Sequence, residues 1–69
     1  MKGASSLAEA LPKEMARVRD ELLPEYDAIP TGCWAAAMMR ADLDRAARAL
    51  AEGDLAGMIR VYQSLKEYQ

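Results

Sequence analysis

The residue with the clearest potential for covalent chemistry is Cys33, which begins a predicted helix. A helix N-terminus lowers the pKa of a thiol and so makes it a better nucleophile. The sequence contains no His, however, so no Cys–His or Ser–His pair can form and the commonest general base is absent. The neighbouring Trp34 and Ala35 are apolar, and we therefore interpret Cys33 as a small buried or half-buried hydrophobic residue.

A group of carboxylates could support acid–base catalysis or bind a divalent cation. Its members are Asp20, Glu21, Glu25 and Asp27. Helical spacing places Asp20 and Asp27 about two turns apart, and no loop has the glycine-punctuated spacing of a calcium site. We interpret these carboxylates as a solvated helix face. With one Cys and no His, neither an intrachain disulfide nor a zinc site is predicted. We expect no catalytic residue, no cofactor and no metal.

Three polar residues near the C-terminus invite comparison with DNA-binding proteins. Arg60, Gln63 and Ser64 follow a short turn, and in a helix-turn-helix they would face the major groove. The same segment has only one other cation, Lys66, which precedes Glu67, and the chain has a net charge of -2. A positive footprint for phosphates is missing, so nucleic-acid binding is not expected.

The elements that position these residues are predicted from apolar spacing and turn residues. A stripe with spacings of three and four residues predicts a helix over about residues 8–28. The stripe consists of Leu7, Leu11, Met15, Val18, Leu22, Tyr26 and Ile29. Pro24 lies inside it and removes the hydrogen bond to the carbonyl of Asp20. Because the apolar spacing continues through Pro24, we expect the helix to kink there.

Two breaks divide the rest of the chain. The first is the segment 29–32, where Pro30 disfavours a helical Ile29 and Thr31 is the expected N-cap of a helix over about 33–52. The second is Gly53-Asp54. Gly53 suits the left-handed residue that ends a helix, and Asp54 suits the N-cap of a third helix over about 55–67.

The sequence therefore predicts an all-α protein, a small three-helix bundle with short connections and a first helix kinked at a proline. A flexible tail over residues 1–6 precedes a single helical domain over residues 7–69. The predicted core consists of Met15, Val18, Leu22, Met39, Leu43, Leu50, Met58, Ile59 and Tyr62.

Several apolar residues remain once these stripes are buried. We predict that they form a protein-interaction surface made of Trp34, Met38, Val61, Leu23 and Tyr68. An exposed apolar patch of that size is uncommon on monomers, and a two-fold homodimer, the commonest oligomer, would cover it. A chain of 69 residues without a disulfide or a metal also has limited means of stabilising itself alone. We therefore expect a homodimer.

Three segments resemble small uncharacterised helical accessory proteins of Mu-like transposable phages and prophages. They are Leu22–Ile29, Ala35–Asp44 and Ala51–Leu55, within a similarity that covers about residues 11–67. The resemblance carries no functional residue across. It implies a viral origin and an intracellular setting, where small accessory phage proteins commonly bind a host or viral protein.

These observations together predict a non-enzymatic protein-interaction module, with a host or viral protein as a further partner. A DNA-binding regulator acting as a dimer and a structural phage component are the alternatives. No apolar run approaches ~18 residues, so no transmembrane helix and no membrane partner are predicted. The single Cys gives no sign of an oxidising compartment, and we expect a cytoplasmic protein.

Overall fold

The computed structural model describes residues 6–69, which contain helices and turns but no strand. The predicted all-α class is confirmed. The elements in chain order are α1 (Ser6–Arg17), a π-helical segment η2 (Val18–Leu22), α2 (Leu23–Asp27), a 3-10 turn η3 (Pro30–Gly32), α3 (Cys33–Glu52) and α4 (Leu55–Glu67). The predicted tail lies outside the described residues apart from Ser6, which begins α1.

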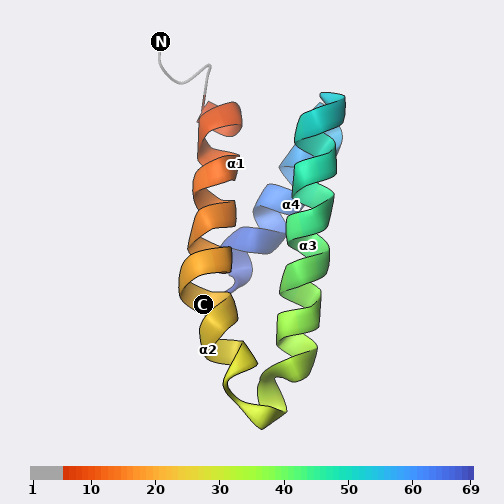
Figure 1. The fold of residues 1–69 in the computed structure, drawn as a ribbon. Helices are drawn as coiled ribbons and strands as arrows, with labels where there is room; N and C mark the ends of the chain where they lie inside the picture. The colour runs from red at the N-terminus through yellow and green to blue at the C-terminus, as the bar shows by residue number, and fades with distance from the viewer. Residues whose placement is uncertain (1–5) are drawn as a thin grey trace.

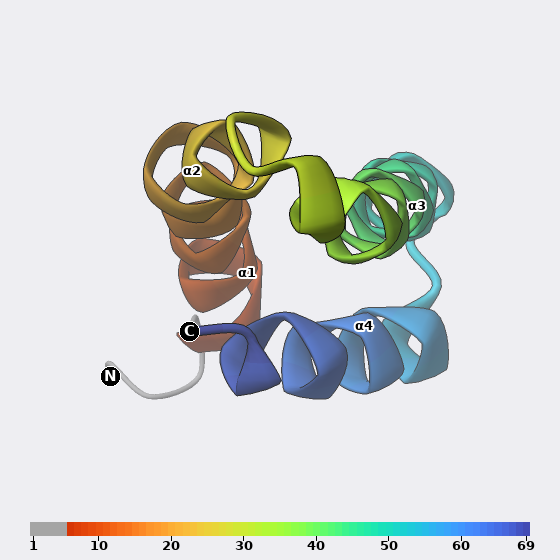
Figure 2. The same ribbon diagram turned by 90° about the horizontal axis from the view of Figure 1, so that it is seen from below.

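The helices form two side-by-side arms with a third element across them. Helices α1 and α2 make one arm, and α3 runs back beside it after the turn at the end of α2 (Figure 1). Helix α4 crosses both arms at a steep angle and packs against α1 and α3 (Figure 2). This crossing places one side of α4 next to the flank of α3.

The chain passes Pro24 by means of the π-helical segment that directly precedes it. The N–H of Leu23 donates to the carbonyl of Val18, five residues back, instead of four back as in an α-helix. A wider turn makes room next to a proline, which lacks an N–H and would crowd the preceding turn. The sequence predicted that Pro24 disturbs the first helix. The structure has a π-helical turn at residues 18–22, directly before Pro24, and the kink itself stays a prediction. The extra residue also sets back the helical phase, so that Leu22 and Leu23 are both half-buried against the core.

The turn between α2 and α3 depends on a close backbone contact. Ile29 is extended, with φ -104° and ψ 123°, as Pro30 predicts. The predicted cap at Thr31 is wrong, because Thr31 lies inside the 3-10 turn and the N-cap of α3 is Gly32, with no side-chain hydrogen bond. Gly32 is buried, and a Cβ there would lie 2.5 Å from the carbonyl oxygen of Tyr26. Only glycine fits at this position without a shift of the backbone.

The turn between α3 and α4 follows the sequence prediction. Gly53 has φ 68° and is left-handed, and the N–H of Asp54 donates to the carbonyl of Ala49 at 2.9 Å. The carboxylate of Asp54 accepts the N–H of Gly57 at 3.1 Å, as expected for an N-cap. A Cβ at Gly57 would lie 2.4 Å from the other carboxylate oxygen of Asp54, so glycine at this position leaves room for the cap.

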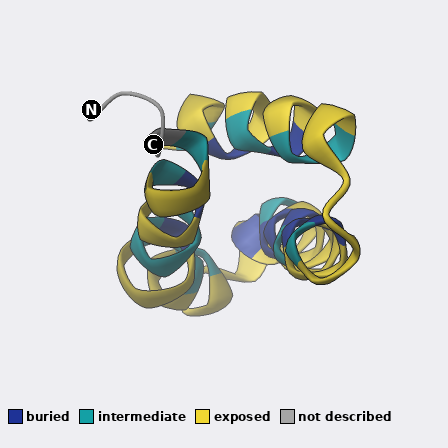
Figure 3. Cartoon of the chain, turned by 90° about the horizontal axis from the view of Figure 1, so that it is seen from above, coloured by how far each residue is buried: buried dark blue, intermediate teal, exposed yellow. Residues whose placement is uncertain are grey.

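The core lies where α1, α3 and α4 meet, on the inward faces of the helices (Figure 3). Its buried residues are Leu11, Val18, Met39, Ala46, Val61 and Leu65. Of the predicted core, Val18 and Met39 are buried. Six others are half-buried against the core, namely Met15, Leu22, Leu43, Leu50, Met58 and Tyr62.

The prediction for Ile59 is wrong, because 44% of this residue is exposed. The reason is the phase of α4. Gly57 and Val61 face α3, so the inward stripe of α4 runs through Val61 and Leu65 and leaves Leu55 and Ile59 outside.

The left-handed turn at Gly53 allows a direct stability test. Nothing lies within 4 Å of a Cβ built at Gly53, so a substitution there acts through the backbone alone. We expect Gly53→Val to destabilise the protein by roughly 1–2 kcal/mol, because a β-branched residue disfavours positive φ. Gly53→Asn should cost less, since asparagine tolerates this conformation. Urea unfolding followed by circular dichroism measures both, and equal losses would contradict the assigned role of the turn.

Candidate protein-interaction surface

The most exposed large apolar residue among those described, Trp34, lies at the start of α3, at the end of the molecule where α2 turns into α3. Trp34 is 75% exposed, Met38 is 45% exposed, and Ile29 in the turn is 47% exposed. Trp34 and Met38 are one helical turn apart on the same side of α3. We call Trp34 and Met38 the Trp34–Met38 surface. Cys33 is exposed beside it, contrary to its interpretation as a buried or half-buried residue.

Of the other three predicted surface residues, Val61 and Leu23 lie in or against the core, whereas Tyr68 lines the same small hollow as Met38. Val61 is 5% exposed and belongs to the core, because the phase of α4 turns it toward α3. Leu23 is half-buried against the core, because the π-helical turn sets back the phase of the residues that follow it. Tyr68 is half-buried just after α4. The five residues therefore do not form one surface, and Trp34 and Met38 are the two that stand exposed.

Tyr68 is part of a hydrogen-bond network that was not predicted. Its hydroxyl donates to Asp42 at 2.6 Å, and Arg45 donates to the other oxygen of the same carboxylate at 3.2 Å. Asp42 is only 8% exposed, although it is charged. A carboxylate at this depth needs such partners, because an unpaired buried charge is costly. The sequence feature that could have predicted this network is the position of Asp42 on the same side of α3 as the core residues Met39 and Ala46.

Two further side-chain bonds hold the end of α4 against the first arm. Arg17 donates to the carbonyl of Leu65 at 3.0 Å, and the hydroxyl of Tyr26 donates to the carbonyl of Gln69 at 2.9 Å. The carbonyl of Leu65 also accepts the N–H of Tyr68 at 3.3 Å, so Arg17 adds a second donor at the end of α4. The C-terminal end of α4 is thus fixed to both arms by side chains.

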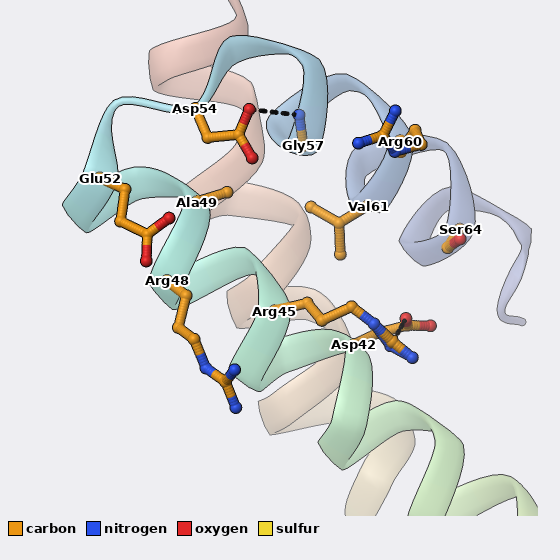
Figure 4. Close-up of a pocket in the computed structure, with 10 residues that line it drawn as sticks. All are labelled: Asp42, Arg45, Arg48, Ala49, Glu52, Asp54, Gly57, Arg60, Val61 and Ser64. Carbon is orange, nitrogen blue, oxygen red and sulfur yellow. Dashed lines mark hydrogen bonds and ion pairs between the residues drawn. The ribbon is translucent and has the colours of Figure 1, made fainter.

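A groove of about 490 Å³ opens between α3 and α4 (Figure 4). Three arginines border it: Arg45 and Arg48 from α3, and Arg60 from α4. Arg45 is paired with Asp42, three residues earlier on α3, and Arg48 pairs with Asp44 and points away from α4. Arg60 has no ion pair among residues 6–69.

The grouping of these arginines was missed at the sequence level. In the sequence Arg60 has only Lys66 as a cationic neighbour in its helix, whereas the crossing of α4 over α3 brings it to the same groove as Arg45. The spacing of residues 45 and 48 along one strip of α3 was visible. The spacing along α3 does not predict the direction in which α4 leaves the turn, and that direction decides where Arg60 lies.

The four carboxylates predicted to form a solvated face, Asp20, Glu21, Glu25 and Asp27, are exposed. Asp20 accepts two hydrogen bonds from Arg19, and Asp27 pairs with Arg40 at 2.5 Å. The hydrogen bond from Arg19 lowers the pKa of Asp20. Within residues 6–69, no group of three or more Cys, Asp or Glu side chains is arranged to hold a metal ion.

Comparisons with known proteins add no relative. No family model, no curated protein and no solved structure matches the chain. None of the helices in the described part combines the length and apolar character that crossing a membrane requires.

The Asp42–Tyr68 bond predicts a pH dependence at the alkaline end. Burial first, and then the hydrogen bond to Asp42, raise the pKa of Tyr68 to about 12. An unfolded tyrosine has a pKa of about 10, so the unfolded chain releases this proton first as the pH rises. The stability contributed by Tyr68 is complete below about pH 10 and is lost as the pH approaches the folded pKa.

We expect Tyr68→Phe to remove this contribution. Urea unfolding of both proteins across the alkaline range measures it, and ionisations common to both cancel in the difference. The wild-type advantage should be roughly 1 kcal/mol near neutral pH, typical of one hydrogen bond, and should shrink above about pH 10. A difference that stays constant with pH would contradict the assigned bond.

Proposed function

We propose that this protein is a non-enzymatic interaction module of the cytoplasm that contacts other proteins through the Trp34–Met38 surface. The observation that carries the proposal is the 75% exposure of Trp34 on the first turn of a long helix. Tryptophan is enriched among the residues that dominate binding energies, and methionine adapts to varied partners. We further propose that the helices act as a three-helix bundle, with the first arm kinked near Pro24, that holds this surface in place.

The gain from covering this surface supports the proposal. A tryptophan side chain buries roughly 150–250 Å², and about three quarters of that area is available here. At ~25 cal/mol per Å², covering Trp34 contributes roughly 3–5 kcal/mol before the costs of association. Met38, one helical turn from Trp34, adds to the same contact. A solvent-exposed tryptophan on a rigid helix loses little side-chain freedom when a partner covers it.

We propose a second copy of the chain as the first partner. In a two-fold contact between the starts of two α3 helices, Trp34 of one copy lies near Met38 of the other. The alanines at positions 37 and 41 on the outer side of α3 allow another helix to approach closely. The resemblance to proteins of Mu-like phages leads us to propose an accessory role there, with a host or viral protein as a further partner.

Sedimentation and fluorescence test the self-association directly. We expect a dimer at micromolar concentration, with a melting temperature that rises with protein concentration. Trp34 is the only tryptophan, so its emission should shift to the blue as the dimer forms. Trp34→Asp should abolish the dimer while leaving the helical circular dichroism spectrum intact.

Ile59→Asp is the matched control, because Ile59 is also an exposed apolar residue but lies on α4. It should leave the dimer unchanged. Sedimentation of the wild type as a monomer at about 100 μM, or equal effects of the two variants, would overturn the proposed dimer contact.

A further inference from the structure

We infer that the Trp34 side chain of a second copy of this chain docks in the small hollow next to Met38. The hollow has a volume of about 260 Å³. Its lining residues are Met38, Asp42, Ser64, Glu67 and Tyr68. The inference rests on the proposed function, because it assigns the contact that Trp34 makes in the proposed dimer.

The size of the hollow suits a single side chain. Pockets that bind small molecules usually measure about 300–1,000 Å³ and enclose most of the ligand. The hollow is smaller, and Met38, Ser64 and Glu67 at its edge are exposed, so it opens to the surface. One bulky side chain from a neighbouring molecule fits such a site better than a free ligand does.

The residues around the hollow match an aromatic side chain that carries one N–H. Met38 presents a thioether, which makes favourable contacts with aromatic rings. Tyr68 adds a ring that is half-buried against the core, and aromatic rings pair favourably at offset or edge-to-face angles. Ser64 and Glu67 provide oxygen acceptors, and an indole N–H needs one acceptor when it is buried. Tryptophan combines the apolar ring and the single donor that this site accommodates.

The charges at the hollow favour a donor and disfavour an acidic occupant. Asp42 and Glu67 line it, whereas no Lys or Arg of residues 6–69 does. Asp42 already accepts the hydroxyl of Tyr68 and the guanidinium of Arg45, so its charge is paired within the chain. The carboxylate of Glu67 stays exposed at the edge, where an indole N–H reaches it without the loss of a charged group's hydration.

The position of Trp34 beside the hollow makes a reciprocal contact possible. Trp34 lies one helical turn before Met38 and eight residues before Asp42, which is about 12 Å along α3. Each copy therefore carries a protruding tryptophan and a hollow on the same flank, and a two-fold axis between them pairs both at once. The exposed alanines 37 and 41 on α3 allow the two helices to approach.

The area of this contact agrees with a weak dimer. Trp34 is 75% exposed, so two docked indoles and the matching area on the partner bury roughly 400–800 Å². Met38 and the two alanines bring the total toward the lower limit of about 1,200 Å² for specific complexes. A total near that limit suits association in the micromolar range.

Mixing two variants tests the docking directly. The Trp34→Ala chain keeps its hollow and contains no tryptophan, since Trp34 is the only one in the sequence. In the Ser64→Arg chain the longer side chain fills the hollow, while the tryptophan stays in place. Each variant alone loses both contacts of the two-fold dimer. A mixed dimer keeps one contact, made by the tryptophan of the Ser64→Arg chain in the hollow of the Trp34→Ala chain.

We expect the mixed dimer to form at least about tenfold more tightly than either variant with itself, because a docked tryptophan is typical of the residues that dominate binding energies. Sedimentation measures the association. The emission of the one tryptophan in the mixture should shift to the blue as the Trp34→Ala chain is added. The double variant Trp34→Ala/Ser64→Arg as the added chain should produce no shift.

Gln63→Arg is the matched control for the filled hollow. Gln63 is exposed on α4 and lines neither hollow, and the substitution changes the net charge by the same amount. The Gln63→Arg dimer should stay within about twofold of the wild type, whereas Ser64→Arg should weaken the dimer at least about tenfold. Ser64 is exposed as well, so both variants should keep their helices, which circular dichroism checks.

A mixed dimer no tighter than either variant with itself, or equal effects of Ser64→Arg and Gln63→Arg, would overturn the inference while the wild-type dimer still stands. The hollow would then be left to a basic side chain of another protein, which the carboxylate of Glu67 attracts. A wild-type chain that sediments as a monomer at about 100 μM would overturn the proposed dimer and this inference together.

Discussion

The two-residue turn between α3 and α4 is the constraint on which the rest of the structure depends. Gly53 reverses the chain in a left-handed conformation, and Asp54 then caps α4 through the N–H of Gly57. Since glycine at position 57 leaves room for the Asp54 carboxylate, the direction and the phase of α4 are set within its first turn. Val61 and Leu65 consequently enter the core, and Arg60 faces the flank of α3.

The end of α4 is fixed as firmly as its start. Tyr68 reaches Asp42 on α3, and Arg17 on α1 bonds to the carbonyl of Leu65. A helix of this length is marginal alone, so tertiary contacts at both of its ends contribute to its stability. They also fix the position of α4 beside α3 and with it the shape of the groove between the two helices.

Local features of the fold were predictable from the sequence, whereas the phase of packed helices was not. Gly53, Asp54 and Pro30 each act through the backbone within a few residues, so their effects are visible in the sequence. The position of Val61 and Ile59 depends on which side of α4 meets two other helices, and the apolar spacing of α4 fits either side. The prediction for Leu23 was wrong for a related reason. The π-helical turn before Pro24 contains one residue more than an α-helical turn, and the apolar spacing in the sequence gives no sign of it.

The candidate surfaces also differ in whether they depend on one helix or on the packing of two. Trp34 was identified because a single stripe of α3 cannot face every apolar residue inward, and that argument needs no knowledge of the other helices. The meeting of Arg60 with Arg45 needs the crossing of α4, which links residues of different helices. Surplus apolar residues can thus be found from one helix, whereas a groove between two helices needs their geometry.

The phase of α4 is the central claim, and solvent paramagnetic relaxation enhancement of methyl signals tests it most directly. A soluble paramagnetic agent broadens the signals of methyl groups that water reaches. We expect the methyl signals of Ile59 to broaden while those of Val61 and Leu65 stay protected, at a concentration where the chain is monomeric. Protection of Ile59 together with broadening of Val61 would contradict it, and the groove that contains Arg60 would then be lost as well.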